Sequence, residues 1–149
     1  MTKSFDDLLA KVSQCSKKTV AVACAQDDAV LEAVKAAKER GIADAILVGN
    51  EAEIKTIART LKMHINEYKI INVEDPVEAA RTAVKLVHDG EADMYMKGLI
   101  DTKTFLKSVL DKEVGLRTDK TLSHVCVFEI KGVDRLLFYQ MLLLYHILI

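Results

Sequence analysis

The sequence has no excess of charge of either sign. Its 21 lysine and arginine residues stand against 22 aspartate and glutamate residues, which leaves a net charge of −1. A near-neutral chain creates no long-range field toward nucleic acid or an acidic membrane, so we expect neither as a partner. A local group of basic residues could still bind a small anion.

Cysteine and histidine are also sparse. The cysteines Cys15, Cys24 and Cys126 lie far apart, form no CxxC pair and are odd in number, which argues against a disulfide framework. Cys24 and Cys126 lie inside apolar runs, where we expect small buried side chains. The four histidines show no metal-ligand spacing, so we expect no metal.

Long hydrophobic runs of the kind that address or anchor a protein are missing. The N-terminus lacks the apolar stretch of a signal peptide, and a reducing cytoplasm fits best. The final run LLFYQMLLLYHILI has 14 residues interrupted by Gln140 and His146, whereas a membrane helix needs about 20. We therefore expect no membrane partner.

With one proline, no low-complexity stretch and no evident linker, the 149 residues are long enough for one domain with a core. Apolar runs bounded by polar residues predict buried strands at 18–25, 43–49, 67–73 and 92–96. Helical patterns separate these strands, and another helix precedes them. The order predicts an α/β fold with a mostly parallel sheet and right-handed crossovers.

Capping residues mark the helix starts. Asp27 or Asp28 can cap the helix after the first strand, and Asn50 with Glu53 forms a capping box for the next. A second capping box, 75–78, places Pro76 at the first helical position. Two later strands at 122–130 and 134–139 are joined by only three residues, which predicts an antiparallel hairpin.

Ligands of open α/β sheets bind beyond the carboxyl ends of the strands, and there only the loop at 97–102 combines a cation, a glycine and a helix start. Lys97 supplies a charge, Gly98 allows close approach to the backbone, and the helix offers free N–H groups for an anion. Alternatively, Gly98 only turns the chain, Asp101 or Thr102 caps the helix, and Lys97 is solvated. The local residues alone favour this second interpretation.

A second basic stretch, GLRTDKTLSHV, precedes the hairpin. Arg117 and Lys120 flank Thr118, and arginine binds phosphate oxygens well because its guanidinium donates two hydrogen bonds at once. An ordinary charged surface loop is the alternative interpretation. No residue is an evident activated nucleophile, so positioning and charge stabilisation are the expected tools of any catalysis.

The stretches ADMYMKGLIDT and GLRTDKTLSHV carry a family resemblance that extends from about Lys18 to Phe138. This region resembles the N-terminal half of the butyryl-type enzymes in the phosphate acetyl/butyryltransferase family. The resemblance implies acyl transfer between coenzyme A and inorganic phosphate, so that acyl-CoA plus phosphate gives acyl phosphate plus CoA. Coenzyme A would be a substrate, with no covalently bound cofactor and no acyl-enzyme.

The resemblance also implies a three-layer α/β/α fold of the isocitrate/isopropylmalate dehydrogenase type, with the active site between two domains, in a homodimer. Thr102 matches a hydroxyl residue near phosphate in the acetyl branch, and Lys107 stands where that branch has an arginine. The residues expected to bind phosphate or coenzyme A are Lys97, Gly98, Thr102, Lys107, Arg117 and Thr118.

Family members are about twice as long, which suits two lobes. We expect residues 1–138 to form the N-terminal lobe, with the second lobe and its catalytic residues absent. From Tyr139 the resemblance stops, and codons for 140–144 can be chosen that read Asp-Ala-Ala-Phe in another frame. We therefore expect 139–149 to be an aberrant apolar tail produced by a frameshift.

Such a chain should have little or no transferase activity and altered self-association. A non-catalytic α/β module that binds coenzyme A or another phosphate-bearing ligand is the alternative function. A related enzyme, an acyl-acyl-carrier-protein:phosphate acyltransferase, shares the general fold, but the two quoted stretches favour the butyryl type.

Overall fold

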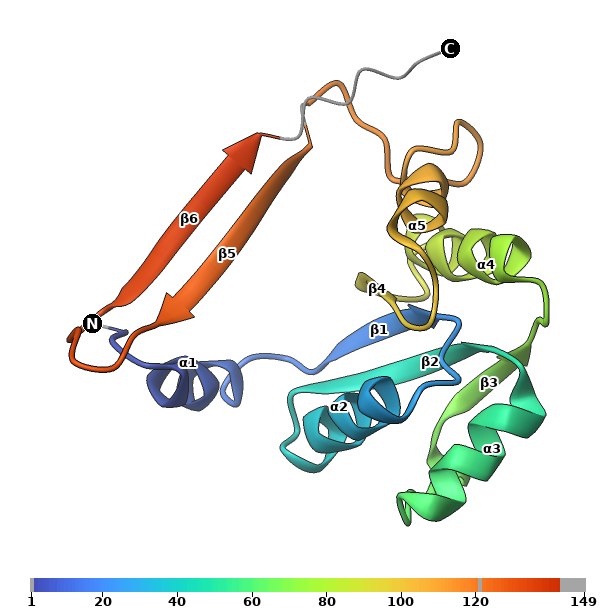
Figure 1. Ribbon diagram of the computed structural model, residues 1–149, viewed down its shortest axis with the longest axis horizontal. Helices are drawn as coiled ribbons and strands as arrows, with labels where there is room; N and C mark the ends of the chain where they lie inside the picture. Colours follow the sequence, from blue (N-terminus) through green and yellow to red (C-terminus); the bar gives the residue numbers. More distant parts are fainter. Residues whose placement is uncertain (1, 121, 143–149) are drawn as a thin grey trace. The chain divides into compact units, whose positions relative to one another are not determined.

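The computed structural model describes residues 2–120 and 122–142 (Figure 1). Its elements in chain order are α1 (Phe5–Val12), β1 (Lys18–Ala23), α2 (Asp28–Glu39), β2 (Ala43–Gly49), α3 (Glu51–Thr60), a 3-10 turn (Ile65–Glu67), β3 (Lys69–Asn72), α4 (Pro76–His88), β4 (Met94–Lys97), α5 (Thr102–Val109), β5 (Ser123–Glu129) and β6 (Leu136–Leu142).

The chain divides into two compact units. One, the sheet unit, is Ser16–Arg117; the other, the hairpin unit, combines the segments Met1–Cys15 and Thr118–Ile149. In the hairpin unit the structure describes residues 2–15, 118–120 and 122–142. The expectation of a single lobe over residues 1–138 stays a prediction, and the two units are described separately below.

The sheet unit contains four parallel strands in the order β3-β2-β1-β4. Val22 of β1 lies opposite Leu47 of β2 and Met96 of β4, which fixes the register at the centre of the sheet. Strands covered on both faces read as continuous apolar runs, as residues 18–25 and 43–49 do. The predicted parallel sheet with alternating helices is confirmed.

Helices cover both faces of this sheet (Figure 1). On one face, Ala21 and Val48 of the sheet pack with the small residues of α4, among them Ala80 and Ala83, and with Phe105 of α5. On the other face, Val22 and Leu47 pack with Leu31 and Val34 of α2 and Ile54 of α3. The predicted α/β fold is confirmed, and this unit has three layers.

The predicted helix caps are also confirmed. The Asn50 side chain accepts a hydrogen bond from the Glu53 amide at 3.1 Å. Asp75 accepts from the amides of Val77 and Glu78 at 3.0 and 2.9 Å, and Pro76 opens the helix. Each cap satisfies an amide that has no partner inside its own helix.

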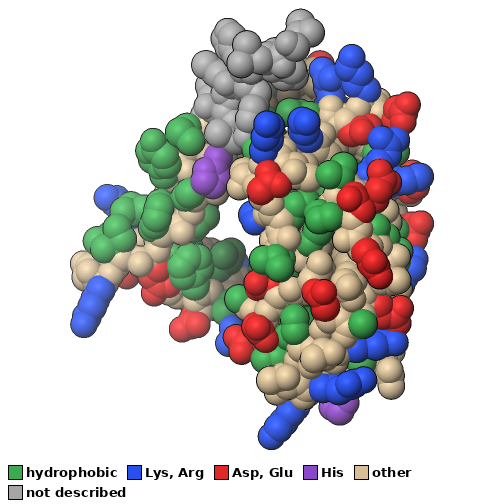
Figure 2. All heavy atoms as spheres, turned by 45° about the vertical axis from the view of Figure 1, so that its right-hand side comes forward, with side chains coloured by type: hydrophobic (Ala, Val, Ile, Leu, Met, Phe, Trp, Pro, Cys, Tyr) green, Lys and Arg blue, Asp and Glu red, His purple; other side chains and the backbone are tan. Residues whose placement is uncertain are grey.

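Lysine and arginine side chains are interspersed with aspartate and glutamate on the face shown in Figure 2, as the near-zero net charge suggests. Several form ion pairs. Lys38, for example, donates to Asp44 at 2.8 Å. Within the described parts of the chain, none of the helices combines the length and apolarity needed to cross a membrane.

In the hairpin unit, β5 and β6 pair antiparallel, with Val127 opposite Phe138. This confirms the predicted hairpin, although β6 begins and ends later than expected because the turn is longer than three residues. Gly132 has a φ of +89° in this turn, and the Val133 amide donates to the Ile130 carbonyl at 3.0 Å. Cys126 is half-buried on β5 rather than buried, since a two-stranded sheet covers little surface. Of the expected apolar tail, residues 139–142 belong to β6, and 143–149 lie outside the described residues.

Candidate functional site

The strand order creates one natural crevice in the sheet unit. From β1 the chain passes through α2 to β2, whereas β4, on the other side of β1, continues into α5 on the opposite face. The loops that leave the carboxyl ends of β1 and β4 therefore diverge to opposite faces. Ligands of open α/β sheets bind in the crevice at such a switch point.

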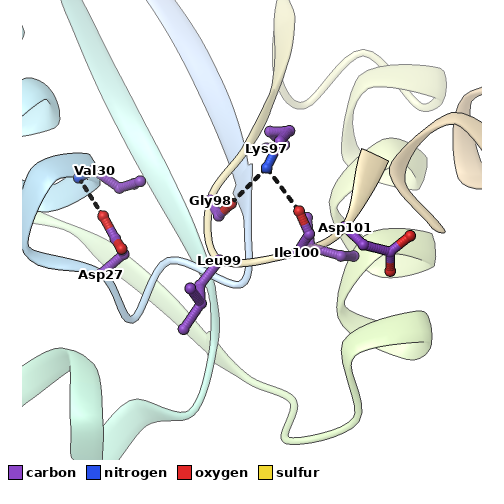
Figure 3. Close-up of a pocket in the computed structure, with 7 residues that line it drawn as sticks. All are labelled: Asp27, Val30, Lys97, Gly98, Leu99, Ile100 and Asp101. Atoms are coloured by element: carbon purple, nitrogen blue, oxygen red, sulfur yellow. Dashed lines mark hydrogen bonds between the residues drawn. The ribbon is translucent and has the colours of Figure 1, made fainter. Parts of the chain in front are cut away.

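A pocket of about 390 Å³ lies at this switch point, as expected for the crevice (Figure 3). The loop after β4 supplies most of its wall, and the start of α2 supplies the rest. Its lining residues are Asp27, Val30, Lys97, Gly98, Leu99, Ile100 and Asp101. The loop selected from the sequence is thus a wall of the pocket.

Gly98 is required by the neighbouring strand. Its amide donates to the Ala23 carbonyl at 2.8 Å, and the Leu99 amide donates to the Cys24 carbonyl at 2.8 Å. A Cβ atom at position 98 would stand 2.2 Å from the Cys24 carbonyl oxygen, which is far inside contact distance. The glycine therefore lets the loop continue the hydrogen bonding of β1 past the end of the sheet.

The Lys97 ammonium folds back onto its own loop. Its Nζ donates to the carbonyl oxygens of Gly98 at 3.2 Å and Ile100 at 2.6 Å (Figure 3). An ammonium has three N–H donors, so one stays available for a ligand in the pocket. Lys97 thus stabilises the loop and can place one charged donor at the pocket.

Two carboxylates in the pocket wall cap helices. Asp101 accepts from the Thr104 amide at 2.9 Å, and Asp27 accepts from the Val30 amide at 3.0 Å (Figure 3 draws the second bond). The hydrogen bonds of Asp101 with Thr104 hold the pKa of its carboxyl below the usual value. The expected capping roles of Asp101 and Asp27 are confirmed. One lysine and two aspartates line the pocket, so its own side chains carry a net negative charge.

Beneath the loop, Cys24 is buried. Its side chain is 1% exposed, and its Sγ lies 3.9 Å from the Pro76 carbonyl oxygen. Burial raises the pKa of the thiol, and the nearby Asp75 carboxylate raises it further, while Lys97 acts in the opposite direction. Cys24 is therefore the small buried side chain that was predicted, held in its neutral form.

Comparison with known proteins shows the family of this chain. The family described as phosphate acetyl/butaryl transferase matches residues 4–82 and 73–141 of the chain. The chain belongs to this family.

Two relatives are phosphate butyryltransferases of Clostridium. The protein of Clostridium beijerinckii is 55% identical over 138 residues, which cover 93% of this chain and 46% of the relative. The protein of Clostridium acetobutylicum is 57% identical over 138 residues, with the same shares covered. The chain thus spans about half the length of the curated relatives it matches.

Solved structures agree on the fold. A branched-chain phosphotransacylase from Enterococcus faecalis superposes with a TM-score of 0.64 at 26% identity, covering 83% of this chain and 42% of that one. A phosphotransacetylase from Staphylococcus aureus has a TM-score of 0.69 at 18% identity, covering 89% and 49%. This second likeness supports the fold alone.

Among the residues that the family resemblance implied, only Lys97 and Gly98 line the switch-point pocket. Thr102 is the exposed first residue of α5, next to the capping Asp101. Lys107 lines a different pocket of about 380 Å³ between α4 and α5. The six residues are therefore not gathered around one cavity of the sheet unit.

The second pocket contains Arg81, which the sequence analysis did not select. Arg81 donates to Asp111 at 3.1 Å and to Glu113 at 2.5 Å, and these two carboxylates raise the pKa of its guanidinium. The pairing is between side chains about 30 positions apart, so no local pattern could indicate it. Because Arg81 is already paired with two carboxylates, Lys107 is the cation of this pocket that is better placed to bind an anion.

Arg117 and Thr118 lie where the two units join in the sequence. Arg117 is the exposed last residue of the sheet unit, and Thr118 is the exposed first residue of the second segment of the hairpin unit. The Thr118 hydroxyl oxygen accepts from the Lys120 amide at 3.2 Å. In residues 2–120 and 122–142, no group of three or more histidine, cysteine, aspartate or glutamate side chains is placed to share a metal ion.

Proposed function

We propose that this chain provides the switch-point half of a phosphate acyltransferase of the butyryl type. The reaction is reversible: acyl-CoA plus inorganic phosphate gives acyl phosphate plus CoA. One observation carries the proposal, the 55–57% identity to two phosphate butyryltransferases over a segment that includes the Lys97 loop. Both substrates are anionic and occur in the cytoplasm, where we place the reaction.

The chemistry needs no covalent intermediate on the protein. A phosphate oxygen attacks the thioester carbonyl carbon, a C–O bond forms, and the C–S bond breaks. The electron pair leaves with sulfur, which then takes up a proton to give the CoA thiol. The protein has to position two anions and stabilise the oxyanion that forms at the carbonyl.

In this chain, the third N–H of Lys97 is the donor available for an anion in the pocket. Asp27 and Asp101 oppose it, so the pocket needs further cations before it can hold phosphate well. Arg117, Thr118, Thr102 and Lys107 are the family-implied candidates. Other cations would come from sequence that the relatives have and this chain does not match.

We therefore expect low turnover from the chain alone. Purified protein is incubated with butyryl-CoA and phosphate, and thiol release is followed with a chromogenic disulfide; the Clostridium beijerinckii phosphate butyryltransferase is the control. Loss of charge stabilisation at such a centre costs roughly a hundredfold or more in rate, which sets the expected deficit. Turnover equal to the control would show that the site is complete within this chain.

The second candidate is a non-catalytic module that binds CoA or another phosphate-bearing ligand. The observation in its favour is that the chain spans 46% of its phosphate butyryltransferase relatives and yet forms the switch-point pocket that Lys97 lines. Titration calorimetry with CoA and with phosphate separates the candidates. Binding without thiol release supports the module. If the chain neither binds these ligands nor releases thiol, both candidates are contradicted.

The resemblance also implied a homodimer with altered association in this chain. We keep this as a proposal, because the predicted dimer depends on sequence in the second half of the family. Light scattering over a range of concentrations tests it. A tight dimer of constant mass would contradict altered association.

A further inference from the structure

The backbone amides of the pocket loop are already bonded inside the protein. The Gly98 amide donates to the Ala23 carbonyl at 2.8 Å. The Leu99 amide donates to the Cys24 carbonyl at 2.8 Å, and the Ile100 amide donates to the Gly98 carbonyl at 2.9 Å. A loop that cradles phosphate does so with free backbone N–H groups. The amides of these three loop residues are therefore not available to a phosphate.

The charged side chains of the pocket also disfavour phosphate. Asp27 and Asp101 are both in its wall, and Lys97 has two of its N–H groups on loop carbonyls. A phosphate would meet two like charges and one partly engaged cation, and like charges repel. A carboxylate has about four lone-pair sites, so each aspartate can accept a hydrogen bond besides the one from its helix. The pocket therefore suits a neutral ligand that has N–H donors and a carbonyl acceptor for Lys97.

Apolar side chains supply the rest of the pocket wall. Leu99, which lines the pocket, is 60% exposed (Figure 3). Val30 at the start of α2 is half-buried, and Ile100 is buried. An exposed leucine gains free energy when an apolar group of a ligand covers it. The volume of about 390 Å³ lies in the range of pockets that hold small organic molecules.

We propose that the switch-point pocket binds the neutral end of acyl-CoA, and that Leu99 is a specificity residue for the acyl chain. This end consists of the acyl chain, the thioester and the adjoining pantetheine amides. The assignment rests on the proposed function, under which acyl-CoA is a substrate. The acyl chain covers Leu99 and Val30. A pantetheine amide N–H donates to the Asp27 or Asp101 carboxylate, and the remaining N–H of Lys97 donates to the thioester carbonyl.

This assignment separates the two substrates in space. Inorganic phosphate and the phosphates of CoA bind outside the pocket, where further cations are needed to hold them. A short acyl chain is uncharged, so Asp27 and Asp101 do not oppose its binding. The thioester carbonyl oxygen gains negative charge when phosphate attacks, and the charged donor of Lys97 stabilises it there. Lys97 thus serves the carbonyl rather than the anion that attacks it.

The test uses the full chain and ligands that separate the two ends of the substrate. The chain is isotopically labelled for NMR and titrated with S-butyrylpantetheine, a neutral thioester that lacks the phosphates of CoA, or with inorganic phosphate. The amide resonances of Leu99 and Ile100 report on the pocket. We expect S-butyrylpantetheine to shift both resonances saturably, with an affinity that does not change with salt because the ligand carries no charge to screen. Phosphate should leave both resonances in place.

The length of the acyl chain tests the role of Leu99. Each CH₂ group that becomes buried should strengthen binding about fourfold, so S-butyrylpantetheine should bind about tenfold more tightly than S-acetylpantetheine. Leu99→Ala should lose most of this preference. Val77→Ala is the matched control and should keep it, since Val77 is 57% exposed on α4 and does not line the pocket. Circular dichroism checks that both variants are folded.

The pocket assignment is overturned if S-butyrylpantetheine leaves the Leu99 and Ile100 amides unshifted, if phosphate shifts them instead, or if Leu99→Ala keeps the full chain-length preference. Thiol release is measured separately on the same protein, so the assignment and the proposed function can fail independently. Saturable binding of S-butyrylpantetheine without thiol release supports the pocket assignment and counts against the transferase. Thiol release from butyryl-CoA with unshifted pocket amides counts against the pocket assignment alone.

Discussion

Replacing Gly98 with alanine is the sharpest test of how the pocket loop is built. The added Cβ would lie 2.2 Å from the Cys24 carbonyl oxygen and 2.8 Å from that of Ala23. Both neighbours are backbone atoms of the β1 end, so no flexible side chain can move away. The loop must shift by about 1 Å to reach ordinary contact distance.

The expected cost combines two effects. Overpacking a tight site costs about 1–3 kcal/mol. The shift also weakens the bonds from the Gly98 and Leu99 amides to β1, each worth about 1 kcal/mol net. If both bonds are lost, we therefore expect Gly98→Ala to lower the free energy of unfolding by about 3–5 kcal/mol, a large part of the stability of a small domain.

Urea titration followed by far-UV circular dichroism measures this loss. Gly41→Ala is the control, because a Cβ there meets no atom within 4 Å and only the φ of +69° is unfavourable. That variant should lose about 1–2 kcal/mol. The lower end of the cost expected for overpacking is about 1 kcal/mol. If the free energy of unfolding of Gly98→Ala differs from that of the parent by less than this, the steric reasoning is refuted.

Three further changes test particular contacts. Tyr95→Phe removes the hydroxyl that donates to the Ala80 carbonyl at 3.2 Å and should cost about 1 kcal/mol at pH 8. Burial raises the pKa of Tyr95 to about 12, so between pH 10 and 12 the folded state keeps a proton that the unfolded state releases, and the parent should lose stability. Tyr95→Phe should show a smaller loss over this range. Urea titrations at pH 8 and 11 compare the two proteins. Asp75→Ala deletes the cap of α4 and should cost about 1 kcal/mol in the same assay, whereas no loss would show that the cap is replaced by water. Lys38→Met removes the hydrogen bond that lowers the pKa of Asp44. The variant should therefore be less stable than the parent at pH 6, and the difference in stability should shrink as the pH falls below the usual pKa of an aspartate carboxyl. A difference that does not change with pH would contradict this.

The elements that the sequence predicted well are those fixed by neighbours in the chain. The strand at 43–49 was found with its limits unchanged, and Asn50, Asp75 and Asp101 cap the helices that follow them. An apolar run between polar residues and a carboxylate or amide before a helix act over a few residues. Local sequence is therefore sufficient to reveal them.

The features that sequence reasoning did not reach depend on distant partners. The position of β4 beside β1 follows from how α4 packs on the sheet, and the pairing of Arg81 with Asp111 joins α4 to the loop after α5. The turn before β6 was also judged too short, because only the fold shows that residues up to Arg135 precede the strand. The loop selected from the sequence lines the switch-point pocket, and its role as a binding site stays a prediction. The direction of the Lys97 ammonium was not predictable from the sequence.

The two interpretations of the Lys97 loop, anion binding and chain turning, compete physically at the same helix start. Asp101 already occupies the Thr104 amide, and its negative charge opposes the helix dipole that would attract phosphate. Gly98 is explained by the approach of β1, and Lys97 by two loop carbonyls. Lys97 therefore keeps one N–H for a ligand, and Thr102 at the start of α5 is the other candidate donor of this loop.

Replacing Lys97 with methionine separates these roles. Two carbonyl oxygens lose their charged donor, so the variant should lose about 1–3 kcal/mol of stability whether or not the loop binds a ligand. Only a binding role predicts a second effect, a smaller rise in Tm when CoA or phosphate is added. If the ligand-induced rise in Tm is the same in Lys97→Met as in the parent, Lys97 stabilises the loop alone, and the anion must be held by other cations.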